Sequence, residues 1–384
     1  SHISHISHIS HLLSLIFYHF NSMRKSFSII AVLCFAILLT GASCVSLGGS
    51  GGEATSGPAG MFISQDKGET WQQIVSLPTN AGVKNIANVS VYRLVDDPND
   101  PDTMYLTSRD SGMFFTYDNG VTWQRSADGS LASGYVYSVA VHPKNKCVLY
   151  ATNGRQVYRS DDCSRHWIEM YRESRLDIVI NSLAFNYFAP YQIYLSESNG
   201  DIMQSFDSGN SWTVTKRFNT RIYGITASPL QEGLIYATTA GEGLYRSDNG
   251  GVDWLPLANG LKKYSGAMDY RRFVLHAKNP NTVYWVSTYG ILRSDDKGDT
   301  WNAYNLLTPP GSANIYAFAV NPQNDNELFY TATIGARSTL YKSLDGGKNW
   351  ITKKLPSGQI PTILRPHPTK SSVLFMGFFI PAQK

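Results

Sequence analysis

Cysteine, charged residues and long hydrophobic runs are all scarce in this chain. It has 4 cysteines among 384 residues, 16% of its residues are charged, and its formal net charge is +4. No basic stripe stands out, which argues against nucleic acid as a partner. The H-E-x-x-H, G-x-S-x-G, phosphate-loop and dinucleotide-binding motifs are missing as well. We therefore expect neither a metal site nor a cofactor, and no motif points to an enzyme activity.

The main apolar run covers residues 28–39 and is too short to cross a bilayer comfortably. It follows a positive segment, Met23 to Lys25, and precedes Cys44 and a stretch rich in glycine and serine. This order resembles a bacterial lipoprotein signal, although Gly41 stands where such signals usually carry leucine. Lipidation of Cys44 would anchor an exported protein in the cell envelope, in the periplasm or at the surface, and ordinary signal cleavage is the alternative.

These segments divide the chain into four parts. We expect residues 1–22 to be an upstream or cloning remnant, 23–43 a signal peptide, 44–59 a flexible tether and 60–384 the folded domain. Cys34 would leave with the signal, so only Cys147 and Cys163 would remain in the folded domain. A hairpin turning at residues 154–155 brings these two close together, and an oxidising compartment favours a disulfide between them. Metal binding by the two cysteines is the alternative.

One short signature recurs along the folded domain: Ser or Thr, then Asp two residues later, Gly four later and Trp seven later. Its copies begin at Ser64, Thr116, Ser160, Ser205, Ser247, Ser294 and Ser343, 42 to 52 residues apart. A period of about 45 residues is typical of propeller blades with four short strands.

Each copy lies between two apolar or aromatic runs, as a hairpin loop would. The Asp position should accept hydrogen bonds from the loop backbone, Gly should supply a positive φ, and Trp should bury its ring and cover its own N–H. These structural acceptors are Asp66, Asp118, Asp162, Asp207, Asn249, Asp296 and Asp345. Ser164 replaces the glycine in one copy.

Two further strand-like segments precede most copies, as at residues 137–143 and 148–152. The first copy lacks them, whereas residues 362–368 and 373–377 form such a pair with no signature after it. The chain ends therefore complete one another. We predict an all-β fold, a single seven-bladed β-propeller with four strands, A to D, in each blade. The C-terminal A–B strands should pair with the N-terminal C–D strands, which closes the ring and removes open sheet edges.

Ligands of propellers commonly bind where the loops from strand D to the next strand A surround the channel. A column of residues near the start of strand A falls there: Tyr92, Tyr137, Asn181, Tyr223, Arg271, Tyr316 and Thr362, with Arg93 and Arg272 one place further on. Tyr and Arg dominate protein-interface hot spots, and Tyr also stacks on sugar rings. Either these residues form a binding site at the channel mouth, or the tyrosines pack between blades.

His142, His276 and His367 hold matching places at the end of strand A. Equivalent residues of a ring lie in different blades, so we interpret these histidines as structural and not as metal ligands. Acidic pairs such as residues 96–97, 161–162 and 295–296 fall in turns, where capping is the ordinary role.

The signature, following strands such as residues 243–246, resembles the Asp-box or bacterial neuraminidase repeat superfamily. Sialidases, xyloglucanases, the sortilin receptor domain and the photosystem II assembly factors share this repeat, so the resemblance implies the fold and not one function. Sialidases have six blades and an Arg-Ile-Pro segment that this chain lacks. Xyloglucanases place their catalytic acids across two rings, and a single ring offers no pair of carboxylates that we can name.

A single exported ring is closer in kind to the assembly factors and to sortilin-like propellers, which bind other proteins. We therefore expect a non-enzymatic, monomeric ring that docks a membrane or envelope protein at the channel mouth, as a scaffold or assembly factor. A glycan-binding or glycan-cleaving propeller that uses the same face is one alternative. A purely structural surface protein is another.

Overall fold

The structure, a computed structural model, describes residues 55–127 and 129–381. These belong to one compact unit, Glu53–Lys384. The expected signal peptide, Cys44 and most of the expected tether lie outside the described residues. Within the described part, helices long and apolar enough to cross a membrane are absent.

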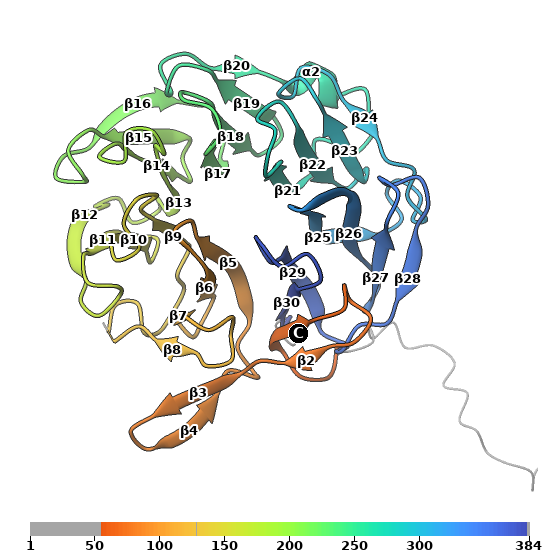
Figure 1. Cartoon of the computed structure of the whole chain (residues 1–384). Coiled ribbons are helices and arrows are strands. Elements are labelled where there is room, and N and C mark those ends of the chain that lie inside the picture. Colours follow the sequence, from red (N-terminus) through yellow and green to blue (C-terminus); the bar gives the residue numbers. More distant parts are fainter. Residues whose placement is uncertain (1–54, 128, 382–384) are drawn as a thin grey trace, which may run out of the picture. The chain divides into compact units, whose positions relative to one another are not determined.

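Seven four-stranded antiparallel sheets form a ring (Figure 1). The first three complete blades are β5 (Val91–Asp97), β6 (Asp100–Ser108), β7 (Met113–Thr116), β8 (Gln124–Arg125); β9 (Ser138–Val141), β10 (Leu149–Thr152), β11 (Gln156–Ser160), β12 (Ile168–Arg172); and β13 (Ile180–Phe185), β14 (Ile193–Glu197), β15 (Asp201–Ser205), β16 (Thr213–Arg217). The next three are β17 (Ile222–Ala227), β18 (Ile235–Thr239), β19 (Gly243–Ser247), β20 (Leu255–Pro256); β21 (Tyr270–Leu275), β22 (Val283–Ser287), β23 (Ile291–Ser294), β24 (Asn302–Ala303); and β25 (Asn314–Asn321), β26 (Asn324–Ile334), β27 (Arg337–Ser343), β28 (Ile351–Lys353).

The seventh blade joins the two ends of the domain, as predicted. Its sheet order is β2-β1-β30-β29, from β1 (Gly60–Ser64), β2 (Gln72–Gln73), β29 (Ile360–Pro366) and β30 (Leu374–Phe379). Strand β1 pairs antiparallel with β30, with Gly60 opposite Phe378 and Ser64 opposite Leu374. The predicted fold, blade number and mode of ring closure are therefore confirmed.

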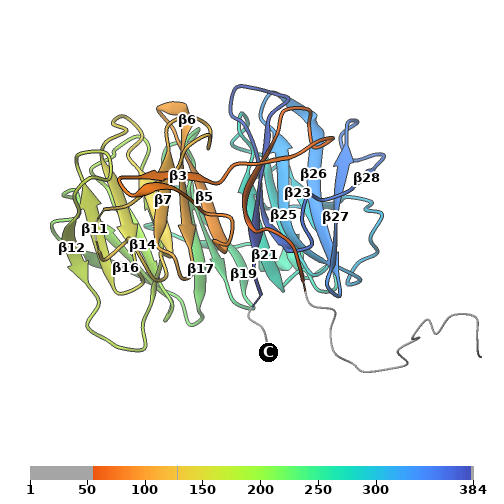
Figure 2. The ribbon, with the colours of Figure 1, turned by 90° about the horizontal axis from the view of Figure 1, so that it is seen from below.

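The ring has two distinct faces (Figure 2). We call the face that carries the loops from each strand D to the next strand A the mouth face. The opposite face carries the seven signature turns, and we call it the motif face. The described chain begins at the mouth face, because the Thr55 hydroxyl donates to Gln359 Oε1 in the loop after β28.

The signature turns have the predicted geometry. In the first, the Ser64 hydroxyl donates to Asp66 Oδ1 at 2.7 Å and accepts the Gly68 N–H at 2.7 Å. Asp66 Oδ1 also accepts the Thr70 N–H at 2.8 Å. Gly68 has φ 85°, and Ser164, which replaces glycine in the third turn, has φ 69°. Each turn therefore satisfies its own polar groups, which explains why an acidic residue recurs here without a catalytic role.

The tryptophans of the signature pack as expected, but their N–H groups differ. Those of Trp123, Trp212, Trp254 and Trp350 donate to backbone carbonyls at 2.9 to 3.1 Å. Those of Trp71, Trp167 and Trp301 are buried with no partner in the described structure. The expectation that every tryptophan covers its own N–H is therefore wrong for three copies.

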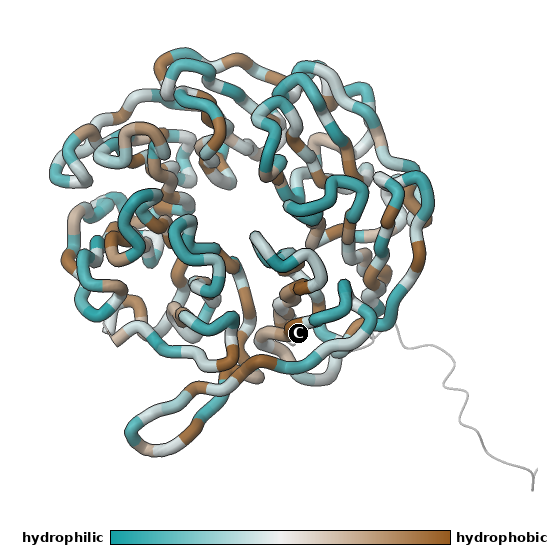
Figure 3. The backbone as a smooth tube through the Cα atoms, in the orientation of Figure 1, coloured by the Kyte–Doolittle hydropathy of each residue, from teal (hydrophilic) through white to brown (hydrophobic). Residues whose placement is uncertain are grey.

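The hydrophobic core lies between neighbouring blades. One cluster, for example, joins Tyr105 of β6 to Leu149 of β10 and to Trp167. Hydrophobic stretches lie within the blades, whereas most connecting loops are hydrophilic (Figure 3). Because each blade covers the next, the inner strands are held firmly around the channel that they line.

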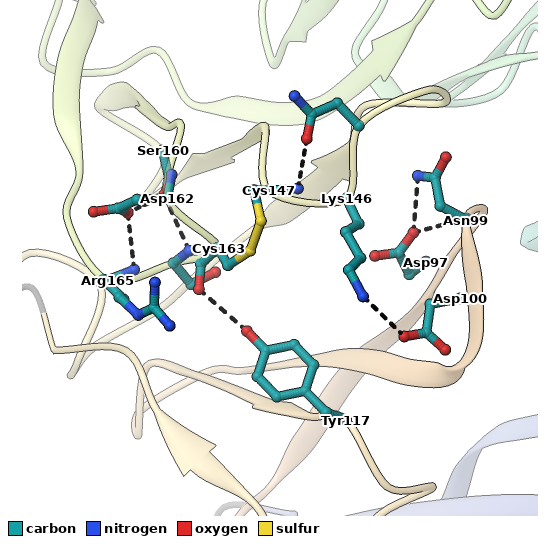
Figure 4. Close-up of a disulfide and its surroundings, with 12 residues drawn as sticks. Asp97, Asn99, Asp100, Tyr117, Lys146, Cys147, Ser160, Asp162, Cys163 and Arg165 are labelled. Carbon is teal, nitrogen blue, oxygen red and sulfur yellow. Dashed lines mark hydrogen bonds and ion pairs between the residues drawn. A yellow bond between two sulfur atoms is a disulfide. The ribbon is translucent and has the colours of Figure 1, made fainter.

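Cys147 and Cys163, the pair expected from the sequence, are joined by a disulfide (Figure 4). It connects the turn before β10 to the signature turn after β11, and the Cys163 N–H donates to the Cys147 carbonyl at 3.1 Å. The Tyr117 hydroxyl of the preceding blade donates to the Cys163 carbonyl at 3.2 Å. The disulfide thus fixes one edge of its own blade on the motif face, away from the mouth.

Two elements were missed by the sequence analysis. A hairpin of β3 (Ser76–Thr79) and β4 (Gly82–Asn85) projects from the outside of the ring (Figure 1). A one-turn helix, α2 (Ala258–Leu261), lies in the longest loop of the mouth face. Neither belongs to the repeat, so its period could not reveal them.

Candidate functional site

Three of the four predicted mouth tyrosines fall into two groups at the starts of inner strands, and Tyr316 of β25 belongs to neither group. In one, Tyr92 meets Tyr135 edge-on at a ring distance of 5.0 Å, and Tyr135 stacks on Tyr137 at 3.8 Å. In the other, Tyr223 stacks on Tyr270 at 5.3 Å. The sequence column contained three of these five residues. Tyr135 and Tyr270 lie one or two residues before column members, and this adjacency was the available signal.

An arginine that the sequence analysis missed lies over the rings of two tyrosines in this first group. The guanidinium carbon of Arg109, in the turn after β6, lies 5.6 Å from the Tyr92 ring centre and 5.9 Å from that of Tyr135. That of Arg93 lies 5.2 Å from the Tyr92 ring centre. Cations over aromatic rings are favourable, most of all where water is partly excluded. The mouth is therefore both aromatic and positively charged.

The three predicted arginines hold different positions. Arg272 donates to the carbonyls of Tyr316 at 3.1 Å and Thr362 at 2.6 Å, which ties together three neighbouring inner strands. Arg271 is exposed and donates to Asn314 Oδ1 at 3.3 Å. Arg93 has one long hydrogen bond, 3.5 Å to the Tyr92 hydroxyl.

None of Arg93, Arg271 and Arg272 forms an ion pair with a carboxylate anywhere in residues 55–127 and 129–381. The uncompensated charge affects a neighbouring phenol. Burial by itself would raise the pKa of Tyr92, but the charge of Arg93, the hydrogen bond with Tyr135 and the charge of Arg109 together lower it. A group that is partly buried and positively charged favours an anionic ligand.

Two members of the sequence column have structural roles instead. Asn181 is buried, its amide N–H₂ donates to the Ile222 carbonyl, and its Oδ1 accepts the Ser196 hydroxyl at 2.6 Å. The Thr362 hydroxyl donates to the Val91 carbonyl at 3.2 Å. Both side chains therefore connect neighbouring blades. The exposed members at the mouth are Tyr223 and Arg271.

The other end of the channel holds a cavity of about 440 Å³ that the sequence did not indicate. Asp96 and Arg365 line it, and Arg365 Nε lies 2.6 Å from Asp96 Oδ2. His276 and Asp325 also line it, with His276 Nε2 3.1 Å from Asp325 Oδ1. Both carboxylates on the wall are thus held by basic side chains, an arrangement unlike the free acid–base pair of a glycosidase.

A buried cluster of carboxyl groups lies apart from both channel ends. Arg175 Nη2 contacts Glu173 Oε2 at 2.7 Å and Glu197 Oε2 at 2.8 Å, and both carboxyl groups are almost fully buried. Burial and the neighbouring Glu173 raise the pKa of Glu197 to about 8, and hydrogen bonds from Arg175 lower that of Glu173. The pair shares one arginine at contact distance, so it lacks the separation that glycosidases need.

The three aligned histidines cap turns. In each, Nδ1 accepts a backbone N–H two residues later, at 3.1 Å from Lys144, 3.0 Å from Lys278 and 3.1 Å from Thr369. They lie in three different blades. The structural interpretation of His142, His276 and His367 therefore agrees with their hydrogen bonds.

Comparison with known proteins places this geometry in context. Residues 59–187 match the family described as sortilin, neurotensin receptor 3. A xyloglucanase of Paenibacillus sp. is 33% identical over 149 residues, 33% of this chain and 14% of the relative. A xyloglucanase of Hypocrea jecorina is 31% identical over 141 residues, 32% of this chain and 16% of the relative.

Two solved structures share the whole ring. The GH74 xyloglucanase of Xanthomonas campestris has a TM-score of 0.59 at 16% identity, over 81% of this chain and 52% of that one. YCF48 bound to D1 peptide has a TM-score of 0.58 at 16% identity, over 85% of this chain and 99% of that one. The chain therefore has the propeller fold of these two structures.

This propeller matches only part of its curated relatives. The matches to the two xyloglucanases span less than a fifth of the length of those proteins. The solved structures are too distant in sequence to show more than a shared fold. The relatives therefore establish the architecture, and the function has to be argued from the site.

Proposed function

We propose that this propeller is a non-enzymatic binding module, a scaffold or assembly factor that docks an acidic segment of a partner protein at its channel mouth. We further propose that it is exported and held at the cell envelope by its N-terminal segment, through lipidation of Cys44. The observation that carries the docking proposal is that Arg93, Arg109, Arg271 and Arg272, which lie among the mouth tyrosines, form no ion pair with a carboxylate of the described residues.

The chemistry of the mouth fits a protein segment. Arg93 and Arg109 stand against aromatic rings, so their guanidinium groups are fixed and partly desolvated before a ligand arrives. Charge-assisted hydrogen bonds to a carboxylate are stronger than neutral ones. Tyr223, 40% exposed, and Tyr270 supply an adjacent aromatic surface of the kind that dominates interface hot spots. YCF48, which has the same fold, has been solved with a peptide bound.

A glycan-binding role is the second candidate, favoured by the 33% identity to a xyloglucanase over a third of the chain. The same tyrosines could stack on sugar rings. Hydrolysis has less support, since the carboxylates on the cavity wall are tied to Arg365 and His276. A glycan ligand would not require unpaired arginines, and this difference separates the two candidates.

The test is capture from host envelope extract by the mature chain, read by mass spectrometry. The variant Arg93→Gln/Arg271→Gln removes two mouth charges and leaves Arg272, which ties the inner strands together, in place. The control variant, Arg165→Gln/Lys348→Gln, removes two exposed charges from the motif face. A defined protein retained by wild type and control but lost by the mouth variant supports docking. Capture of polysaccharide alone, or equal capture by all three, contradicts it.

A further inference from the structure

The two faces of the ring differ in charge. The signature turns place six aspartates on the motif face, namely Asp66, Asp118, Asp162, Asp207, Asp296 and Asp345. The mouth face has three exposed acids in its loops, Asp110, Asp177 and Asp269, and they are outnumbered by exposed bases, namely Arg109, Arg175, Arg221, Lys262, Lys263, Arg271, Arg337 and Lys354. This difference follows from the repeat itself, because the turn that needs an aspartate occurs only between strands C and D. The mouth face is consequently the basic side of the ring.

Lysines on the mouth face lie along one arc of the ring. Lys262 and Lys263 follow α2 in the loop before β21, and Lys354 follows β28 two blades further on. All three are exposed, and none forms an ion pair with a carboxylate in the described residues. Arg221, in the loop before β17, extends the arc at its other end and is also exposed. These charges are free to meet an external anionic surface.

Exposed apolar side chains stand in the same arc, between the lysines. Leu307, in the loop before β25, is 57% exposed, and Ile334, at the turn from β26 to β27, is 56% exposed. Apolar tips flanked by lysines suit an interface whose outer layer is charged and whose inner layer is apolar. A folded protein partner would need a continuous surface of complementary shape, whereas this arc consists of separate loop tips.

The chain itself joins the ring beside this arc. Gln359 Nε2 donates to the Gly57 carbonyl at 3.2 Å, next to the loop that carries Lys354. Cys44 precedes Thr55 by 11 residues, a length that spans at most about 40 Å when extended. The described chain thus enters the ring on the mouth face, beside the basic arc, and this is the face nearest to an anchor at Cys44 along the chain.

We infer that the arc formed by Lys262, Lys263, Leu307, Ile334 and Lys354 is a surface that rests on an anionic phospholipid bilayer. This inference rests on the proposed envelope location, but it adds a second contact that is independent of the partner protein. Anionic lipids attract a polybasic patch, so this second contact would fix which face of an anchored ring meets the bilayer. The channel mouth would then face the bilayer, where a segment of a membrane protein emerges.

The test uses residues 45–384, so that neither a lipid anchor nor the apolar run at residues 28–39 contributes. The binding of this chain to phosphatidylcholine vesicles is compared, by co-sedimentation, with binding to vesicles that also contain phosphatidylglycerol. We expect binding to the anionic vesicles alone, weakened by salt. The variant Lys262→Glu/Lys263→Glu/Lys354→Glu should bind at least about 100-fold more weakly, since each base near an anionic surface contributes about a factor of five or more.

The matched control is Lys144→Glu/Lys278→Glu/Lys348→Glu, which makes the same charge change at exposed positions of the motif face. It should bind anionic vesicles nearly as well as the parent chain. Equal loss in both variants, or binding that ignores phosphatidylglycerol, would overturn the inference. Because these vesicles contain no protein, this failure is distinguishable from failure of partner capture, which the Arg93→Gln/Arg271→Gln variant measures.

Discussion

Trp71 and Trp123 occupy the same place in the repeat, but their indole N–H groups have different surroundings. Trp123 is fully buried and its N–H donates to the Ile74 carbonyl at 2.9 Å, across the boundary between two blades. The N–H of Trp71 is buried without a partner in the described structure. Substituting phenylalanine removes the N–H and part of the ring in both cases, so the two substitutions differ in the hydrogen bond and in burial, since Trp71 is only partly buried.

The expected costs follow from that difference. Trp123→Phe leaves the Ile74 carbonyl buried and unpaired, which costs about 1–3 kcal/mol, and also opens a small cavity, so we expect a total of about 3 kcal/mol. Trp71→Phe loses less packing, because Trp71 is only partly buried, and it removes a buried N–H that has no partner in the described structure. We expect the free energy of unfolding to fall by less than about 1 kcal/mol for this variant.

Urea unfolding followed by circular dichroism measures both variants against the wild type. The wild type and the variants should unfold in parallel transitions, so that midpoints can be compared directly. Equal destabilisation by Trp71→Phe and Trp123→Phe would refute the reasoning. A larger cost for Trp71→Phe would refute it more strongly, because the hydrogen bond would then contribute nothing.

Three further predictions concern charge and the disulfide. Replacing Cys147 and Cys163 by serine should lower the free energy of unfolding by about 3 kcal/mol, measured by urea unfolding, because the bond closes a loop with a sequence separation of 16. The pKa of Glu197 is raised from 4.5 to about 8, so the folded state holds this proton more tightly than the unfolded state does. Stability should therefore fall as pH rises through this range, and Glu197→Gln should abolish the accompanying fall in melting temperature. Hydrogen bonds from Thr70 lower the pKa of Asp66 from 3.8 to about 2, so stability should be lost as pH falls through this range, and Asp66→Asn should lose less than wild type in the same melts.

Much of the fold could be predicted from the sequence because each repeat contains the residues that form its own turn. A turn that satisfies its polar groups with Ser64, Asp66 and Gly68 is encoded locally, and its period counts the blades. The closure of the ring followed from the leftover strands, now β29 and β30, because an open sheet edge is unfavourable. The hairpin of β3 and β4 escaped prediction, since it occurs once and has no signature of its own.

The site was less predictable, because the contacts of a residue in the ring depend on its neighbouring blades. Tyr92, Tyr223 and Arg93 could be found because aligned positions of a repeat share one place in the ring. Asn181 lies in the same column, but its amide is hydrogen-bonded to the Ile222 carbonyl and the Ser196 hydroxyl. The Ile222 carbonyl belongs to the next blade, so this hydrogen bond forms only when the blades pack together. Whether the mouth arginines form ion pairs is decided by the assembled ring, and a linear sequence does not display it.

The most direct test of the account is photo-crosslinking from the channel mouth. A photoreactive phenylalanine analogue at Tyr223, which is 40% exposed on the mouth face, is compared with the same analogue at Phe206, which is 54% exposed on the motif face. In host envelopes, the account predicts one defined protein crosslinked from position 223 and none from position 206. The same products from both positions, or none from the mouth, would contradict it.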